Sequence, residues 1–151
     1  MADDSTTGLK SSRPAIFVGG QENGPLAGGL LELLIVENTQ GLYRCEAKFG
    51  NWGETNNTIG FLYFDRSVLD FGKDFQIKLG SDSIFNGKIM GLEASFPEGQ
   101  APEISVLAED RFQDLRMTRR TRTFGDVSDA DVINQVANEH GLSPKIGRAH
   151  V

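Results

Sequence analysis

Few residues of this sequence have the chemistry of a nucleophile or a general base. There is one cysteine, Cys45, and of the two histidines only His140 lies away from the end of the chain. Nucleophilic catalysis needs a serine, threonine or cysteine beside a base and an orienting group. Cys45 alternates with polar neighbours, which predicts a small core residue, and His140 ends a predicted helix, where it would cap or pack. We therefore expect no catalytic residues and no enzymatic activity.

Carboxylates are numerous, but their spacing predicts no metal site. The stretch DRSVLDFGKDF, residues 65–75, holds three aspartates without the alternation of a calcium-binding loop. One cysteine cannot form any of the multi-cysteine zinc spacings. The glycine-rich stretch FVGGQENG, residues 17–24, lacks both the Lys-Ser/Thr pair of a P-loop and the order G-x-G-x-x-G. We expect neither a metal nor a cofactor.

The densest cluster of one charge is a run of four arginines within seven residues: Arg116, Arg119, Arg120 and Arg122. In a strand, three of them would share one face, with Arg119 on the other. Three interpretations are open: a solvated strand face, the rim of a protein–protein interface, or a nucleic-acid surface. Only Phe112 and Phe124 lie nearby as stacking platforms, and the net charge is -6. We therefore expect a surface or an interface, with no nucleic-acid partner.

The composition is that of one globular domain, with room for the beginning of another. The 151 residues are 38% hydrophobic and include 18 glycines and 10 phenylalanines. This usage is typical of short strands joined by tight turns. The polar N-terminal segment has no apolar stretch of a signal peptide, and the longest apolar run is interrupted by Glu32. We expect a chain made in the cytoplasm with no stable membrane insertion.

The elements that must position these residues are mostly strands. Tyr43, Cys45, Ala47 and Phe49 alternate with charged residues, which predicts a strand with one buried face. Similar patterns or bounded apolar runs predict strands at 14–20, 30–38, 74–80, 83–96 and 103–110, with a last strand through the arginine run. The pair Asn86-Gly87 predicts either a hairpin turn or a bulge. The spacing favours a mainly β fold, an antiparallel barrel of six to seven strands.

A single amphipathic helix follows the strands. Ser128 and Asp131 form a capping-box variant, and Gly141 and Pro144 mark the helix end. Val132, Ile133 and Val136 lie on one apolar stripe, which needs a partner surface. We divide the chain into a flexible tail (1–12), a β-barrel (13–124) and a helix that opens a second region (125–144), with a hinge at Gly125.

The last residues, KIGRAHV (145–151), have no structural pattern. One frame of a widely used short-read sequencing adapter translates as Ile-Gly-Arg-Ala-His-Val followed by a stop, and its preceding bases fit the codon of Lys145. We interpret residues 145–151 as adapter-derived and the chain as truncated after Pro144. A longer genomic sequence that continues differently after the same ANEHGLSP would test this interpretation. A genomic frame that reads Ile-Gly-Arg-Ala-His-Val and then stops would contradict it.

Several short motifs in residues 84–142 together resemble the phage late control gene D family. They comprise Gly87–Ile89, the D-R-F-x-D-L stretch at 110–115, the R-x-x-R-x-F stretch at 119–124 and the S-D-x-D-V-I…EHGL helix. These are baseplate hub proteins related to VgrG-type spikes and to hubs of contractile injection systems. The resemblance implies a two-barrel homotrimer that joins the tail tube to the central spike. It also implies a chain more than twice this length.

The leading hypothesis is therefore a structural part of a phage tail or injection machine, assembled in the cytoplasm and carried in the virion tail or baseplate. Its expected partners are further copies of itself and the tube and spike proteins. The expected interface residues are Arg116, Arg119, Arg120, Arg122, Val132, Ile133 and Val136. The alternative is a small nucleic-acid-binding β-barrel that uses the arginines at 116–122.

Overall fold

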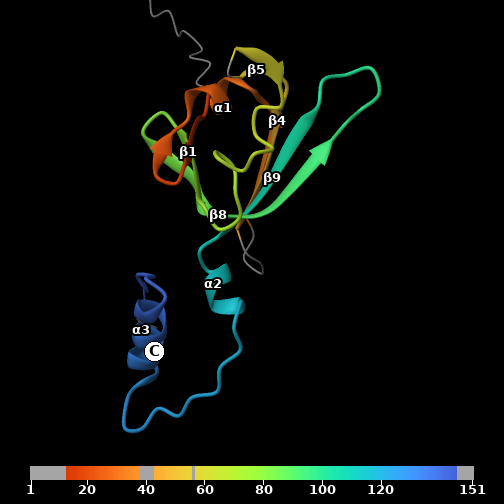
Figure 1. The fold of residues 1–151 in the computed structure, drawn as a ribbon. Coiled ribbons are helices and arrows are strands. Elements are labelled where there is room, and N and C mark those ends of the chain that lie inside the picture. The colour runs from red at the N-terminus through yellow and green to blue at the C-terminus, as the bar shows by residue number, and fades with distance from the viewer. Residues whose placement is uncertain (1–12, 38–42, 56, 146–151) are drawn as a thin grey trace, which may run out of the picture.

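The chain folds into one large antiparallel sheet with short helices at its margins (Figure 1). The structure is a computed structural model, and it describes residues 13–37, 43–55 and 57–145. The predicted tail at 1–12 and residues 146–151 lie outside this range. The sheet contains β1 (Ala15–Val18), β2 (Gln21–Glu22), β3 (Leu30–Val36), β4 (Arg44–Gly50), β7 (Asp74–Leu79), β8 (Asp82–Ser95) and β9 (Glu103–Asp110). A separate hairpin joins β5 (Gly53–Thr55) to β6 (Thr58–Gly60), and the helices are α1 (Gly24–Gly28), α2 (Gln113–Arg116) and α3 (Asp129–Glu139).

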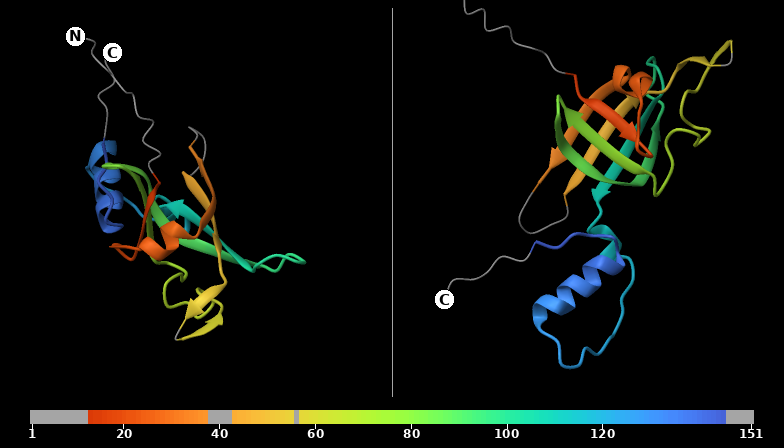
Figure 2. Two further views of the ribbon diagram at one scale, coloured as in Figure 1. Left: turned by 90° about the horizontal axis from the view of Figure 1, so that it is seen from above. Right: turned by 90° about the vertical axis from the view of Figure 1, so that its left-hand side faces the viewer.

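The strand order is β2-β1-β7-β8-β9-β4-β3, and every neighbouring pair is antiparallel. The predicted mainly β class and the antiparallel arrangement of six to seven strands are confirmed, although the seventh strand is the short β2 and not the predicted one. The predicted barrel does not close, because no pairing joins β3 to β1 or β2 in the described residues. β2 is only two residues long, and the chain leaves it through α1 rather than along a further strand. The sheet therefore curls without closing (Figure 2).

α1 spans the connection between the two edges of the sheet. Asn23 caps it, since its Oδ1 accepts a hydrogen bond from Leu26 N at 2.8 Å, and Pro25 stands in its first turn. Leu26 is fully buried in the core. A proline can start a helix, but it has no backbone N–H to donate to a neighbouring strand. The segment between the edge strands β2 and β3 therefore favours a helix.

Alternation places the core on one face of the strands. Cys45, Ala47 and Phe49 of β4 are buried as predicted, and so are Phe75 and Ile77 of β7. Leu79 is 44% exposed, contrary to its predicted burial, because it is the last residue of β7 before the turn at Gly80. The alternation of apolar and polar residues therefore identified the buried face of both strands. The one exception, Leu79, lies at the end of its strand.

β8 runs as one strand through the position where a turn was an open alternative. Asn86 and Gly87 pair with Gln76 and Phe75 of β7, so they form no hairpin. β8 has irregularities on both sides of this pair: its register against β7 shifts between Phe85 and Ser83, and its register against β9 shifts between Ile89 and Gly91. Beyond this bulge the β8–β9 hairpin continues away from the rest of the sheet (Figure 1).

The predicted last strand through the arginine run is wrong. After β9 the chain forms α2 and then an irregular segment to Ser128. Its Arg and Thr residues offer no apolar face for a sheet to bury, and most of them are exposed. The residue in the left-handed conformation is Asp126, with φ 54°, rather than the predicted hinge Gly125.

The predicted helix is confirmed as α3. Ser128 Oγ accepts a hydrogen bond from Asp131 N, and Asp131 accepts one from Ser128 N, which completes the capping box. Gly141 takes φ 65°, and Leu142 N donates to Ala137 O at 2.9 Å. α3 lies beyond one end of the sheet and does not pack closely against a strand (Figures 1 and 2). In the part of the chain that the structure describes, no helix is long and apolar enough to cross a membrane.

The first testable prediction concerns Gly87, where β8 and β9 approach closely. A Cβ atom at this position would lie 2.1 Å from the carbonyl oxygen of Glu109, a backbone atom that cannot move aside on its own. We expect Gly87→Ala to lower the free energy of unfolding by roughly 1–3 kcal/mol or more in a urea titration. Gly60→Ala in β6 is the matched control, since its new Cβ would meet Thr55 at an ordinary 3.7 Å. Equal midpoints for the two variants would show that the close approach does not constrain the sheet.

Candidate functional site

In the described residues, two surfaces expose side chains that could bind a partner, and they lie at opposite ends of the molecule. The first contains the predicted arginines. Arg122 Nη1 donates to both carboxylate oxygens of Glu139 on α3, at 2.7 and 2.6 Å. This hydrogen bond holds the pKa of Glu139 below its usual value and raises the pKa of Arg122. The pair ties the irregular segment to α3, but its exposure to solvent keeps its contribution to stability small.

A groove of about 430 Å³ lies between this segment and α3. The structure brings Arg119, Arg120, Arg122 and Val136 together along its wall, which is completed by Leu115, Thr118, Phe124, Glu139 and His140. Arg116, at the end of α2, is exposed outside this groove. Among the described residues, Arg116, Arg119 and Arg120 form no ion pair. Three guanidinium groups are therefore available to a partner.

The predicted apolar stripe of α3 divides between two environments. Val132 and Val136 are half-buried, whereas the side chain of Ile133 is 50% exposed. The one buried residue of α3 is Ala137, which lies on the same predicted helical stripe but was not among the predicted interface residues. The three predicted residues therefore do not form a single contact surface.

The second surface is a cluster of aromatic side chains that the sequence interpretation missed. It consists of Trp52, Phe61, Phe64 and Phe96, which we call the aromatic cluster. Ring centroids lie 5.2 Å apart for Trp52 and Phe61, 4.7 Å for Phe61 and Phe64, and 5.7 Å for Phe64 and Phe96. Trp52 is 48% exposed, Phe61 45% and Phe96 62%. Contiguous apolar rings in solvent commonly mark an interaction site.

One buried asparagine positions half of the aromatic cluster. Asn51 is fully buried, and its Oδ1 accepts hydrogen bonds from Leu62 N at 2.9 Å and Tyr63 N at 2.8 Å. Its own backbone N donates to Pro102 O, in the loop between β8 and β9 just before β9 begins. The side chain therefore fixes the strand end that carries Trp52 against the segment that carries Phe61 and Phe64.

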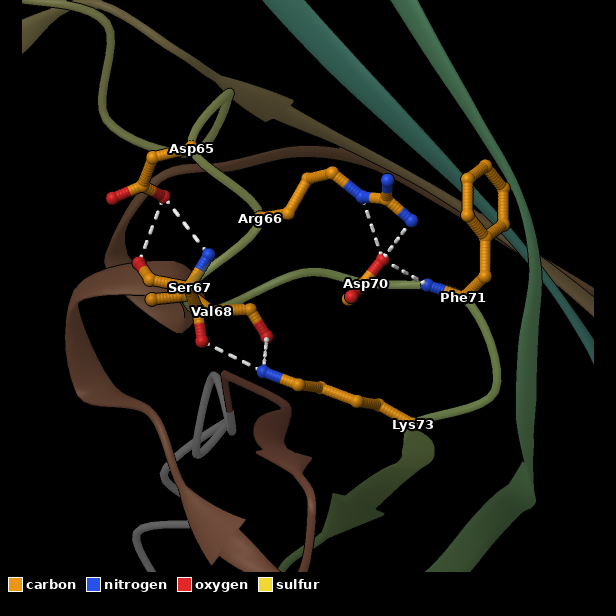
Figure 3. Close-up of polar contacts among 7 residues, drawn as sticks. All are labelled: Asp65, Arg66, Ser67, Val68, Asp70, Phe71 and Lys73. Carbon is orange, nitrogen blue, oxygen red and sulfur yellow. Dashed lines mark hydrogen bonds and ion pairs between the residues drawn. The ribbon is translucent and has the colours of Figure 1, made fainter.

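The segment after the aromatic cluster is stabilised by its own carboxylates (Figure 3). Asp65 Oδ1 accepts from Ser67 N at 3.0 Å, and Asp70 Oδ1 accepts from Arg66 Nε at 2.7 Å. These hydrogen bonds hold the pKa values of both carboxyl groups below their usual range. Lys73 Nζ donates to the carbonyl oxygens of Ser67 and Val68 (Figure 3). The carboxylates thus satisfy loop groups, and no set of three or more His, Cys, Asp or Glu suited to a metal occurs in the described ranges.

The two residues with nucleophile or base chemistry lie far from a common centre. Cys45 is buried inside β4, and burial raises the pKa of its thiol to about 12, so the thiolate form is suppressed at neutral pH. His140 caps the end of α3, which lies beyond one end of the sheet and outside its core (Figure 1). The structure does not bring them together.

The sequence model of one protein family, described as the Alg8 N-terminal domain, matches residues 55–151. The chain belongs to the Alg8 N-terminal domain family. The resemblance to the phage late control gene D family is therefore wrong, since the match covers the same residues 84–142 that suggested it. The motifs behind that resemblance were a strand that contains glycine, a strand that ends in acidic residues, and a capped helix. Capping boxes and glycine positions follow from helix and sheet geometry, so they recur in unrelated families.

The fold of this Alg8 N-terminal domain family member is similar to that of a prophage tail protein. A crystal structure described as "prophage MuSo2, 43 kDa tail protein from Shewanella oneidensis" superposes with a TM-score of 0.65 and 13% sequence identity. The match covers 85% of this chain and 38% of that one, so this chain spans well under half the length of the tail protein. At this identity the likeness shows the fold alone. No curated protein matches the sequence.

The second testable prediction concerns Asn51. Asn51→Ala removes the acceptor of two backbone hydrogen bonds inside the protein, so we expect the free energy of unfolding to fall by about 1–3 kcal/mol. Trp52 is the sole tryptophan, so its emission reports on the aromatic cluster directly. We expect the emission to shift to longer wavelength as the neighbouring segment is released. The control is Asn86→Ala at an exposed position of β8. An unchanged emission spectrum in Asn51→Ala would show that the asparagine does not position the cluster.

Proposed function

We propose that this member of the Alg8 N-terminal domain family is a structural component of a phage tail or a related contractile injection machine. The observation that supports this most is the fold, which a phage tail protein shares over 85% of this chain. The narrower expectations, a hub position between tube and spike and a homotrimer, came with the late control gene D resemblance and lose that support. The proposal retains two expectations: the chain is assembled in the cytoplasm, and it is then incorporated into a tail.

The placement of reactive groups supports a role without catalysis. A nucleophile must be accessible and deprotonated when it attacks, and Cys45 is buried with a raised pKa. The aspartates at 65 and 70 accept hydrogen bonds from their own loop. Binding chemistry, by contrast, is exposed at both ends of the molecule, as expected of a part that contacts several neighbours.

A nucleic-acid role is less well supported. Single-stranded nucleic acid is bound by basic side chains along the backbone combined with aromatic platforms under the bases. Here the exposed arginines lie near α3, whereas the aromatic cluster lies beside β5 at the other end (Figure 1). The arginines and the aromatic cluster therefore cannot act on the same few nucleotides, and the exposed ring beside the arginines is Phe112.

The third testable prediction follows from the assembly role. We expect deletion of the coding sequence from its genome to abolish complete tails, as seen by negative-stain electron microscopy. Expression of the wild-type chain in trans should restore them. Normal particles after deletion would contradict the proposal. So would salt-dependent binding of oligonucleotides that Arg119→Ala with Arg120→Ala abolishes and Arg13→Ala with Arg44→Ala does not, because that result favours the nucleic-acid role.

A further inference from the structure

We propose that copies of this chain associate head to tail, with the aromatic cluster of one copy receiving the arginine segment of the next. The arginine segment is defined here as residues 116–122. This inference rests on the proposed assembly role and specifies which surfaces meet. The partner at each end is thus a second copy of the chain.

The aromatic end of the molecule is apolar at its centre and acidic around it. Beside Trp52 lies a hollow of about 410 Å³ that is also lined by Glu54 and by Ile59, whose side chain is 69% exposed. The two stretches that build this end, residues 51–65 and 91–102, contain no lysine or arginine. They contain four acidic residues: Glu54, Asp65, Glu93 and Glu98. Glu54 and Glu98 are exposed and make no ion pair within the described ranges.

The arginine segment has the opposite charge and its own apolar groups, although the neighbouring α3 begins with Asp129 and Asp131. Residues 116–124 contain four arginines and no acidic residue. Met117 is 64% exposed within this segment, and Phe112 is 57% exposed just before it. Guanidinium groups are attracted to the faces of aromatic rings and to carboxylates, and the other end presents both. The same chain already contains one such contact, with Arg66 Cζ 5.1 Å from the ring centroid of Phe71.

The position of the two surfaces determines the kind of assembly. β5 and α3 lie at opposite ends of the molecule in Figure 1 and in the right-hand view of Figure 2. Contact between two different surfaces is heterologous, so each copy leaves one surface free for the next. Such a contact closes into a ring or extends into a filament, and a symmetric dimer would not use it.

The fourth testable prediction uses paired charge reversals. One variant carries Glu54→Lys with Glu98→Lys, and the other carries Arg119→Glu with Arg120→Glu. All four positions are exposed, so circular dichroism should show both variants folded. We expect the wild-type chain to self-associate with rising concentration in sedimentation velocity. In each variant alone we expect association about tenfold weaker or more, because like charges meet at the contact.

An equimolar mixture of the two variants is the decisive sample. Each contact in the mixture again pairs Lys with Glu or Glu with Arg, so we expect association to return to the wild-type range. Matched controls reverse the same amount of charge elsewhere, with Glu22→Lys plus Glu46→Lys and Arg13→Glu plus Arg44→Glu at exposed positions. These controls should associate as the wild type does.

Four results would overturn the inference. Three of them are a wild-type chain that stays monomeric at every concentration, control variants that lose association equally, and a mixture that stays dissociated. Association that ignores the reversals would overturn head-to-tail contact while leaving the assembly role intact. The assembly role itself fails on the deletion or the oligonucleotide-binding experiment, so the two failures are distinguishable.

Discussion

The apolar core beneath the curled sheet is the constraint on which the other features depend. Phe49, Phe75 and Phe85 come from three different strands and are almost completely buried in the same cluster. Burial of each ring contributes about 1.5–3 kcal/mol, and only a strongly curved sheet can cover all of them. The curvature requires strands to approach closely, as at Gly87, where β9 leaves no space for a side chain. It also leaves the two ends of the sheet open, and these ends carry the exposed binding chemistry.

Short sequence patterns correctly predicted those parts of the fold that depend on residues close together in the chain. Alternation in β4 and the caps of α3 involve residues only a few positions apart, and the structure confirms both. Asn86-Gly87 is compatible with a turn, but pairing with β7 on one side and β9 on the other extends the strand through it. The arginine run could alternate as a strand, yet it has no apolar face to bury, so it stays irregular. Tertiary pairing and burial decided both cases.

The candidate surfaces show the same limit. The arginines are conspicuous in the sequence because four of them fall within seven residues. The aromatic cluster combines residues from three separate segments, and each aromatic residue considered singly is a reasonable core residue. The rings are brought together in solvent by the backbone hydrogen bonds that Asn51 Oδ1 accepts and by the approach of Phe96. A shared tail-protein fold at 13% identity likewise reflects backbone geometry that short motifs do not encode.

The free edge of the sheet, β3, has a bearing on solubility during synthesis. An unpaired edge strand is a template for uncontrolled β-stacking between molecules. In β3 the register against β4 is interrupted between Leu30 and Glu32, and Glu32 lies 3.5 Å from Lys48 on the neighbouring strand. A bulge and a charged pair make this edge a poor template for amyloid-like growth. Copies of the chain should therefore have little tendency to pair with one another through β3.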